Sequence, residues 1–214
     1  MRAEEYDGWY ETPRGRWIGK CEMDLLCKEL RLLPGESILD VGCGTGFFTR
    51  ALAKLIQGRV IGVDIDSNYV EYARRKDTEG SIYAVADARV LPFKNKSFDA
   101  EISIAALCFI DEPITAVREM IRVTRRRFAV GLLNRNSLLW MQKGRQGGRG
   151  GYQGARWHTV GEAKSMFEGL RVKNLCVRTA IHYPNGGRIA EFFEHIIPST
   201  FPSGSFILVS GDVT

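Results

Sequence analysis

The residues with the clearest chemistry in this 214-residue chain form a glycine loop, Leu39-Asp-Val-Gly-Cys-Gly-Thr-Gly46. Glycines at these positions allow a tight turn and a close approach of a ligand to the backbone, because no Cβ atom intervenes. An apolar run before the loop predicts a strand. The spacing after it predicts a helix, whose first N–H groups are unpaired. This order is typical of folds that bind nucleotides and nucleosides.

Two carboxylates and an apolar residue fall where a nucleoside would meet the protein. Asp64 ends the second apolar run and can accept both hydroxyl groups of a ribose. Asp87 follows the third run and can accept from an adenine amine, while Ile65 can pack against the purine. Each Asp alone could be a turn residue or a helix cap. Together with the glycine loop, the three residues predict a nucleoside site.

The spacing of the glycines separates two classes of cofactor. In the dinucleotide fingerprint G-x-G-x-x-G, the third glycine would fall on Phe47 or Thr49. The loop also lacks the Lys-Ser/Thr ending of phosphate loops. The G-x-G-x-G spacing therefore disfavours a pyrophosphate cofactor and makes a dehydrogenase a distant alternative.

Alternating strands and helices are expected to position these residues. The predicted strands are 37–41, 60–64, 82–86, 98–104 and 128–133, and the predicted helices are 47–57, 67–76 and 113–123. This alternation predicts an α/β fold, a Rossmann-like doubly wound and mostly parallel sheet of seven strands with an antiparallel edge strand. The late strands, 172–181 and 206–209, flank a helix at 188–197 and form the edge pair. Ligands bind at the carboxyl ends of such strands.

Composition and charge narrow the class of protein. No apolar run approaches the ~20 residues of a membrane span, and the first residues contain no apolar signal core. Five cysteines without a CxxC pair indicate free thiols, a cytoplasmic location and no metal site. Residues 122–156 hold nine basic and no acidic residues. This segment could face nucleic acid or another anion, or it could be a solvated loop and strand edge.

The combined motifs resemble those of class I S-adenosylmethionine-dependent methyltransferases. The resemblance is carried by the glycine loop, Gly62-Val-Asp-Ile-Asp66, Ala86-Asp-Ala-Arg-Val-Leu-Pro-Phe93 and Ser97-Phe-Asp-Ala100. The nearest group is the small-molecule branch that includes the ubiquinone and menaquinone biosynthesis methyltransferases. The likeness covers roughly residues 34–133. It is specific for the cofactor and unspecific for the methyl acceptor.

The resemblance implies S-adenosylmethionine as cofactor, S-adenosylhomocysteine as product, and a role for each motif residue. The glycine loop would pass close to the methionine part, and Asp40 would help to place its amino group. Backbone carbonyls at Ile104 and Ala105 would receive the ammonium, and Ala88 would offer its N–H to the adenine. The predicted cofactor-binding residues are Asp40, Gly42, Gly44, Gly46, Asp64, Ile65, Asp87, Ala88 and Ile104.

The expected organisation is a single methyltransferase domain over residues 1–214. A helical arm at about 1–33 would precede the core, with acceptor-side insertions at about 135–158 and 182–203. Two segments depart from the family. Thr124-Arg-Arg-Arg-Phe128 replaces a Lys-Pro-Gly-Gly turn and makes this surface basic. Leu107-Cys-Phe-Ile110 replaces a histidine pair, which puts a histidine-based acceptor contact there in doubt.

Candidate acceptor residues lie in the arm and the insertions, and each has two interpretations. His158, with an ordinary pKa near ~6.5, could be a catalytic base or a structural residue. The remaining candidates are aromatic or histidine residues that could form a lid, line a pocket or pack in the core. They are Tyr6, Trp9, Tyr10, Tyr183, Phe192 and His195. Residues 144–154 contain six glycines, which predicts a mobile loop.

The function favoured by the sequence is methyl transfer to a small-molecule acceptor. The alternatives are an RNA or protein methyltransferase that uses segment 122–156, and a catalytically silent module that binds S-adenosylmethionine. Cys108 follows Leu107 rather than Pro or Thr, so it does not match the nucleophile of 5-methylcytosine enzymes. Ile104-Ala-Ala-Leu107 does not match the Asn/Asp-Pro-Pro-aromatic motif of enzymes that methylate base amines.

Overall fold

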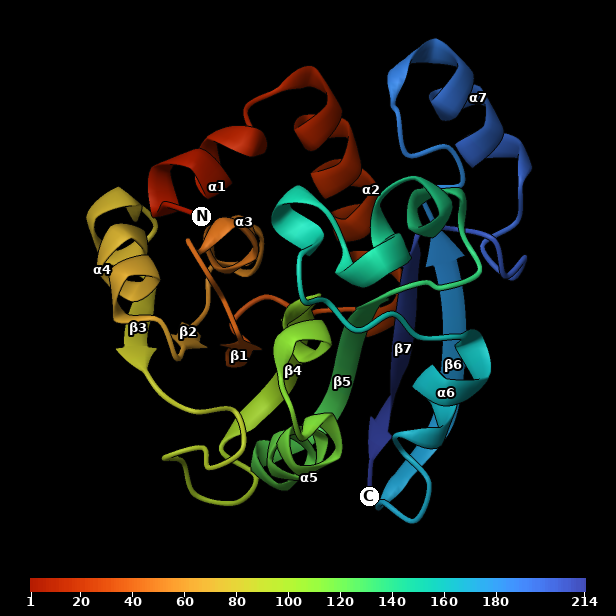
Figure 1. The fold of residues 1–214 in the computed structure, drawn as a ribbon. Helices are drawn as coiled ribbons and strands as arrows, with labels where there is room; N and C mark the ends of the chain where they lie inside the picture. The colour runs from red at the N-terminus through yellow and green to blue at the C-terminus, as the bar shows by residue number, and fades with distance from the viewer.

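The computed structural model describes residues 1–214 as a seven-stranded sheet with helices on both faces (Figure 1). The spatial order is β3-β2-β1-β4-β5-β7-β6. The strands are β1 Ile38–Val41, β2 Val60–Asp64, β3 Ile82–Val85, β4 Phe98–Ile104, β5 Thr124–Leu133, β6 Val172–Ala180 and β7 Phe206–Val213. The helices are α1 Ala3–Trp9, α2 Pro13–Leu30, α3 Phe47–Ile56, α4 Ser67–Lys76, α5 Pro113–Val123, α6 Val160–Ser165 and α7 Gly187–Ile196.

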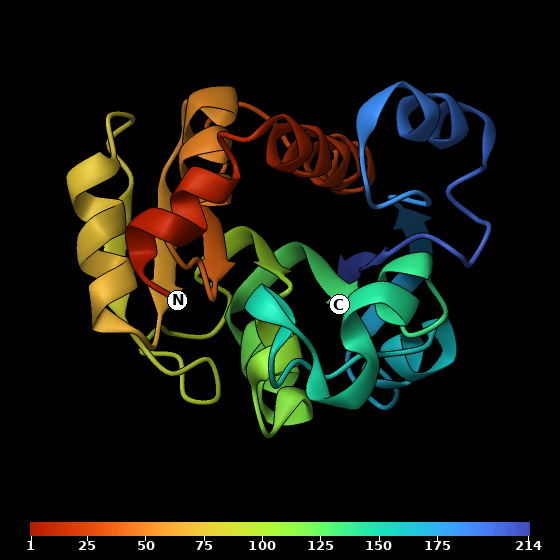
Figure 2. The same ribbon diagram turned by 45° about the horizontal axis from the view of Figure 1, so that its top comes forward.

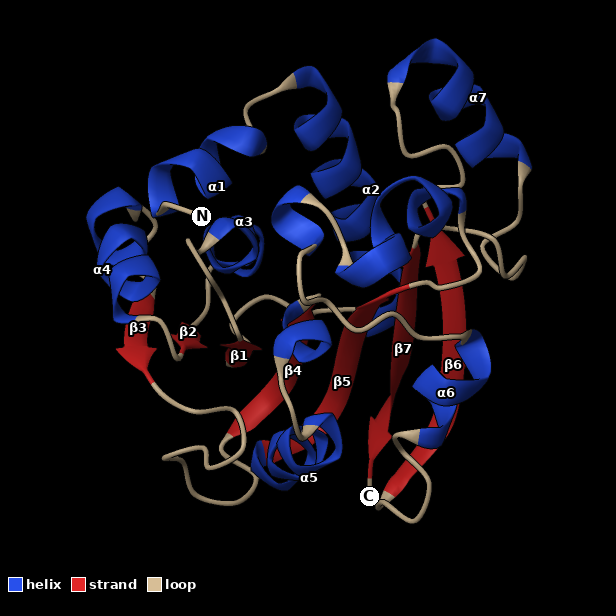
Figure 3. Cartoon of the chain, viewed as in Figure 1, coloured by secondary structure: helices blue, strands red, loops and turns tan.

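The predicted fold class is confirmed, including the antiparallel pair at the edge. Strands β3, β2, β1, β4 and β5 are parallel neighbours, and β7 pairs antiparallel with both β5 and β6. The antiparallel strand is thus second from the edge, and β6 is outermost (Figure 3). The carboxyl ends of the five parallel strands therefore lie along one side of the sheet.

The sheet is covered by two separate helical layers. One apolar cluster joins α2 and α3 to the sheet, with Leu26 and Leu52 fully buried at its centre. The other joins α5 and α6, where Phe128 and Phe167 stack at 4.8 Å between ring centroids. Strands buried on both faces are mostly apolar, which is why the sequence pattern located them.

Two strands extend beyond the predicted ends. β5 begins at Thr124, four residues before the predicted start, although three arginines follow. Arg125 pairs with Asp99 at 2.7 Å, and Arg127 pairs with the buried Glu36. The charged segment can therefore continue the sheet. β7 runs to Val213 instead of 209 because strands on both sides supply hydrogen-bond partners.

The N-terminal arm consists of two helices, α1 and α2. Thr12 separates them, since its hydroxyl accepts the N–H of Gly15 at 3.0 Å and caps α2. Helix α1 is held in place by Asp7, which is 3% exposed and pairs with Arg50 at 2.9 Å and Lys76 at 2.7 Å. These pairs fix α1 across α3 and α4 (Figure 2).

The glycine-rich loop is folded into short helical turns, which the sequence did not predict. These turns, called here the turn segment, are Trp140–Gly144, Arg145–Gly147 and Gly150–Tyr152. Tyr152 packs on Trp157 with ring centroids 5.5 Å apart, and Trp157 belongs to the core. The glycines permit the turns, and aromatic packing holds them in place.

Neither a membrane-crossing helix nor a disulfide is found. Each helix is too short or too polar to traverse a bilayer, and all five cysteines are free thiols.

Glu101 is a buried carboxyl group in the centre of β4. Its side chain is fully buried, and neither carboxyl oxygen has a hydrogen-bond partner. Burial raises the pKa of Glu101 well above its ordinary value. The group is therefore protonated in the folded protein at pH values where it ionises in the unfolded chain.

We predict that Glu101→Gln removes a pH-dependent loss of stability. Below the unfolded pKa both proteins carry a neutral side chain. As the pH rises toward the folded pKa, the unfolded wild type releases a proton, and its free energy of unfolding falls. The difference between variant and wild type should grow by up to about 1.4 kcal/mol per pH unit. Urea unfolding at pH 5, 6.5 and 8 measures this, and a constant difference would contradict it.

Candidate functional site

The glycine loop between β1 and α3 accepts only glycine at two of its positions. Gly42 has φ +74°, and a Cβ atom there would lie 2.2 Å from the Cβ of Ala106. Gly46 has φ +80°, and its Cβ would lie 2.8 Å from the ring of Tyr83. At Gly44 a Cβ would meet only the Tyr6 ring, at 3.6 Å. The space above Gly44 is therefore open for a ligand.

Asp64 is bonded to this loop from the tip of β2. Its Oδ2 accepts the N–H of Gly44 at 2.8 Å, and its Oδ1 accepts the N–H of Asp66 at 3.0 Å. Burial is the largest cause of the raised pKa of Asp64. Each oxygen keeps a free lone pair, so a fixed carboxylate is available to two hydroxyl groups. Ile65 beside it is 66% exposed, as an apolar surface for a purine would be.

Asp40 lies beneath the loop, 2% exposed. Its Oδ2 accepts the hydroxyl of Thr49 at 2.6 Å, and its Oδ1 forms no hydrogen bond. Burial raises the pKa of Asp40 to about 7. A carboxylate in these surroundings is complementary to an ammonium group, which would favour its ionised form. The role predicted for Asp40, to place the methionine amino group, stays a prediction.

Asp87 follows β3 and is engaged by Arg89, a partner that the sequence analysis missed. The two side chains form an ion pair at 2.7 Å, and Arg89 holds the pKa of Asp87 below its ordinary value. Ala88 between them is buried. An adenine amine would share the carboxylate with Arg89, and the role predicted for Asp87 stays a prediction.

Backbone strain marks the end of β4. Ala105 has φ +59°, a conformation that non-glycine residues rarely adopt. Its carbonyl accepts the N–H of Cys108 at 3.2 Å, and the reversed chain brings Ala106 against Gly42. The strain therefore holds the end of β4, with Ile104 as its last residue, against the glycine loop.

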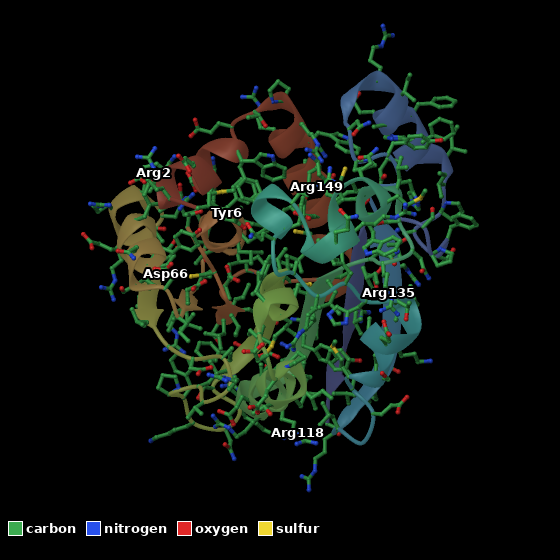
Figure 4. The ribbon with its side chains drawn as sticks, in the orientation of Figure 1. Arg2, Tyr6, Asp66, Arg118, Arg135 and Arg149 are labelled. Atoms are coloured by element: carbon green, nitrogen blue, oxygen red, sulfur yellow. The ribbon has the colours of Figure 1, made fainter.

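Tyr6 of α1 and Tyr10, which directly follows α1, both lie near the loop, but they have different surroundings. Tyr6 points inward beside Gly44 and stacks on Tyr69, with ring centroids 5.7 Å apart, whereas Arg2 points outward (Figure 4). Tyr10 is buried against Phe47, with ring centroids 3.8 Å apart. Tyr6 is thus in the position of a cover, and Tyr10 is packing for the arm.

His158 lies at the carboxyl end of β5 in the opposite helical layer. Its backbone N–H donates to the carbonyl of Leu133 at 2.8 Å. The Nε2 of its imidazole is buried and has no hydrogen-bond partner. Burial lowers its pKa, with Arg135 and Arg156 acting in the same direction. The imidazole is therefore neutral at pH 7.

Two candidates in the late insertion are exposed on α7, neither in a pocket nor in the core. Phe192 is 60% exposed, and His195 is also exposed. Tyr183 stacks on Phe193 with ring centroids 4.5 Å apart. Cys108 is fully buried, and its sulfur accepts the N–H of Leu133 at 3.3 Å, which supports a packing role.

The basic segment 122–156 is largely neutralised by acids from elsewhere in the chain. Six of its nine basic side chains form ion pairs, with Glu119, Asp99, Glu36, Glu162 and Asp111 as partners. Lys143, Arg145 and Arg149 of the turn segment form none. The segment therefore presents no continuous positive surface.

A separate hollow of about 240 Å³ lies away from this site, near the ends of α2 and β7. Charged and polar residues line it, including Lys28, Glu29 and Asp212. None of the predicted cofactor-binding residues contributes to it.

Comparison with known proteins agrees with this geometry. Residues 39–127 match a family described as "Methyltransferase domain". The matched residues include the glycine loop, Asp64 and Asp87. This agrees with the resemblance read from the motifs, and S-adenosylmethionine is the cofactor of the class.

Individual relatives cover the chain to different extents. An uncharacterised protein of Mycobacterium tuberculosis is 30% identical over 86% of this chain, which spans only 63% of that protein. An O-methyltransferase of Penicillium expansum is 38% identical over 55% of this chain and 46% of its own. A Thermotoga maritima structure, described as a methyltransferase and possible histamine N-methyltransferase, has a TM-score of 0.75 at 24% identity. It covers 98% of this chain and 94% of its own, and it shows the shared fold.

We predict that Asp64→Asn weakens S-adenosylhomocysteine binding by roughly 10- to 100-fold, because hydrogen bonds to a charged group contribute about 1.5–3 kcal/mol. Calorimetry measures the affinity. The matched control is Asp66→Asn in the same loop, where the side chain caps α4 by accepting the N–H of Asn68 at 2.9 Å. Asn caps helices as well as Asp does. Equal affinities for the two variants would contradict the ribose role.

Proposed function

We propose that this chain transfers the methyl group of S-adenosylmethionine to a small-molecule acceptor. The observation that carries the proposal is the hydrogen bond between Gly44 and Asp64, made at adjoining strand tips of a class I methyltransferase fold. It joins an open glycine loop to a fixed carboxylate. A nucleoside needs both features at this place.

Each predicted cofactor residue has a part in this proposal. Asp64 holds the ribose hydroxyls, and Asp40 receives the ammonium of the methionine part. The backbone at Ile104 contributes a carbonyl, while Asp87, Ala88 and the exposed Ile65 surround the adenine. Methyl transfer needs little further catalysis once the acceptor is aligned with the methyl group, because the thioether of the sulfonium is already a good leaving group.

The preference for a small acceptor rests on how the arm meets both insertions. Arg14 of α2 donates to the carbonyl of Pro184 at 2.5 Å. A Cβ at Gly151 of the turn segment would lie 3.5 Å from the Met1 side chain. We therefore assign the arm, about 1–33, and the insertions at about 135–158 and 182–203 to the acceptor side of a single domain. The free thiols support the cytoplasmic location included in this proposal.

His158 is retained as a candidate base. The structure supports this role only in that the imidazole is neutral and Nε2 has no partner. His158→Gln should lower the turnover number without changing S-adenosylhomocysteine affinity if the imidazole removes a proton from the acceptor.

The proposal is tested by cofactor binding followed by methyl release. We expect S-adenosylhomocysteine to bind with micromolar affinity in calorimetry. A screen of small acceptors with radiolabelled methyl donor should then yield labelled product. Absence of binding by both donor and product would reject the proposal, whereas binding without any methyl transfer would indicate a silent module.

We predict no salt-sensitive association with RNA. The ion pairs within segment 122–156 leave few free cations, so fewer phosphate contacts are available than the sequence suggests. Fluorescence anisotropy with a mixed-sequence RNA at 50 and 200 mM salt measures this. Saturable binding in the micromolar range that weakens steeply with salt would favour the RNA methyltransferase instead.

A further inference from the structure

Glu22 occupies the centre of the inward face of α2. Residues three and four positions away lie on the same face of a helix. Those residues are Ile18, Gly19, Leu25 and Leu26, and all of them are buried. A carboxylate in the middle of an apolar face has a high desolvation cost unless a partner compensates it.

Glu22 has no such partner within the protein. Its carboxyl group forms no hydrogen bond and no ion pair, although the side chain is partly buried. Glu29, two turns further along the same face, lies 3.4 Å from the guanidinium of Arg178 and 3.5 Å from the Ser210 hydroxyl. The two residues show that this face can satisfy a carboxylate, and that at Glu22 it does not.

Three tyrosines from other segments are near enough to Glu22 to respond to its charge. Its negative charge is among the causes that raise the pKa values of Tyr6, Tyr10 and Tyr152. Tyr6 belongs to α1, Tyr10 directly follows α1, and Tyr152 belongs to the turn segment, which lies across from α2 in Figures 1 and 2. Glu22 is therefore a partly exposed residue of the α2 face that lies toward the aromatic side chains of the arm and the first insertion.

The part of α2 that carries Glu22 lies next to the glycine loop. A Cβ on Gly19, one turn before Glu22, would lie 2.9 Å from the ring of Phe47 and 3.2 Å from that of Tyr10. Phe47 is the first residue of α3, directly after Gly46. Tyr6 in turn lies against Gly44. Glu22 is therefore about one helical turn, ~5 Å, along α2 from the contact with the cofactor loop.

We propose that Glu22 binds the methyl acceptor directly, and that the acceptor is a small primary or secondary amine held as its ammonium ion. This inference rests on the proposed function and adds the chemical class of its substrate. An ammonium group would supply the positive charge that Glu22 lacks. The faces of tyrosine rings attract the same cation.

The state of the free carboxyl group agrees with this assignment. Burial raises the pKa of Glu22 to about 8, with no cation acting against it. A bound ammonium would lower that pKa and restore the carboxylate. The same group can then take a proton from the bound amine, because its pKa in the free protein is close to neutral pH.

The transfer step is balanced with Glu22 as proton acceptor. The ammonium gives one proton to the Glu22 carboxylate and becomes a neutral amine. The nitrogen lone pair forms a bond to the methyl carbon as the carbon–sulfur bond breaks. Its electrons return to sulfur, which leaves a neutral thioether and an N-methylated ammonium. Glu22 then loses its proton to water.

The test compares amines with alcohols of the same carbon skeleton, beginning with phenethylamine and 2-phenylethanol. Wild type should methylate members of the amine set and not their alcohol partners. Glu22→Gln, which keeps the shape and removes the charge, should reduce transfer to the amine by about 100-fold or more. Its affinity for S-adenosylhomocysteine should match that of wild type.

Asp24→Asn is the matched control, because it removes the same charge from the exposed face of α2. It should leave amine transfer unchanged, and Glu22→Asp should retain part of the activity. Transfer confined to alcohols would overturn the amine assignment, as would amine transfer that survives in Glu22→Gln. A wild type that binds S-adenosylhomocysteine but methylates no amine would overturn it too. Failure to bind S-adenosylhomocysteine at all would instead reject the proposed function.

Discussion

The hydrogen bond from Gly44 to Asp64 is the interaction on which the site depends. It requires β1 and β2 to be adjacent and parallel, so that the loop after one strand reaches the carboxylate that ends the other. It also requires backbone with positive φ, because only then does the N–H of the loop turn toward its neighbour. The close approach of Ala106 to Gly42 joins β4 to the same arrangement.

Charge pairing fixes the elements around this core. The buried Asp7 holds α1 to α3 and α4 through two partly exposed cations, and the buried Glu36 compensates two arginines at the start of β5. Such pairs contribute little net stability when buried, since desolvation offsets the attraction. Their effect is on position. Asp7 fixes the N-terminal arm against α3 and α4, and Glu36 fixes the basic start of β5.

Two carboxyl groups stand apart because nothing compensates them. Glu101 is sealed within the sheet, where no ligand can reach it and protonation is the only relief. Glu22 is partly exposed near the cofactor loop, where a ligand can supply the missing charge. The same desolvation therefore has different consequences, decided by access.

The sequence by itself determined the parallel core and the glycine loop at a strand tip, because both depend on local signals. Continuous apolar runs identify buried parallel strands, and glycine spacing identifies a loop at a strand tip. Only the tertiary structure decided which side chains lie near this loop. Tyr6, Glu22 and Tyr152 come from three segments with no shared motif, and Phe192 and His195 could not be placed without knowing which face of α7 is covered. Apart from Arg122, which pairs with Glu119 on the same helix, the pairing of the arginines in segment 122–156 was equally hidden, because their acidic partners lie far away in the chain. Charge balance across space depends on folding, whereas backbone pattern is readable along the chain.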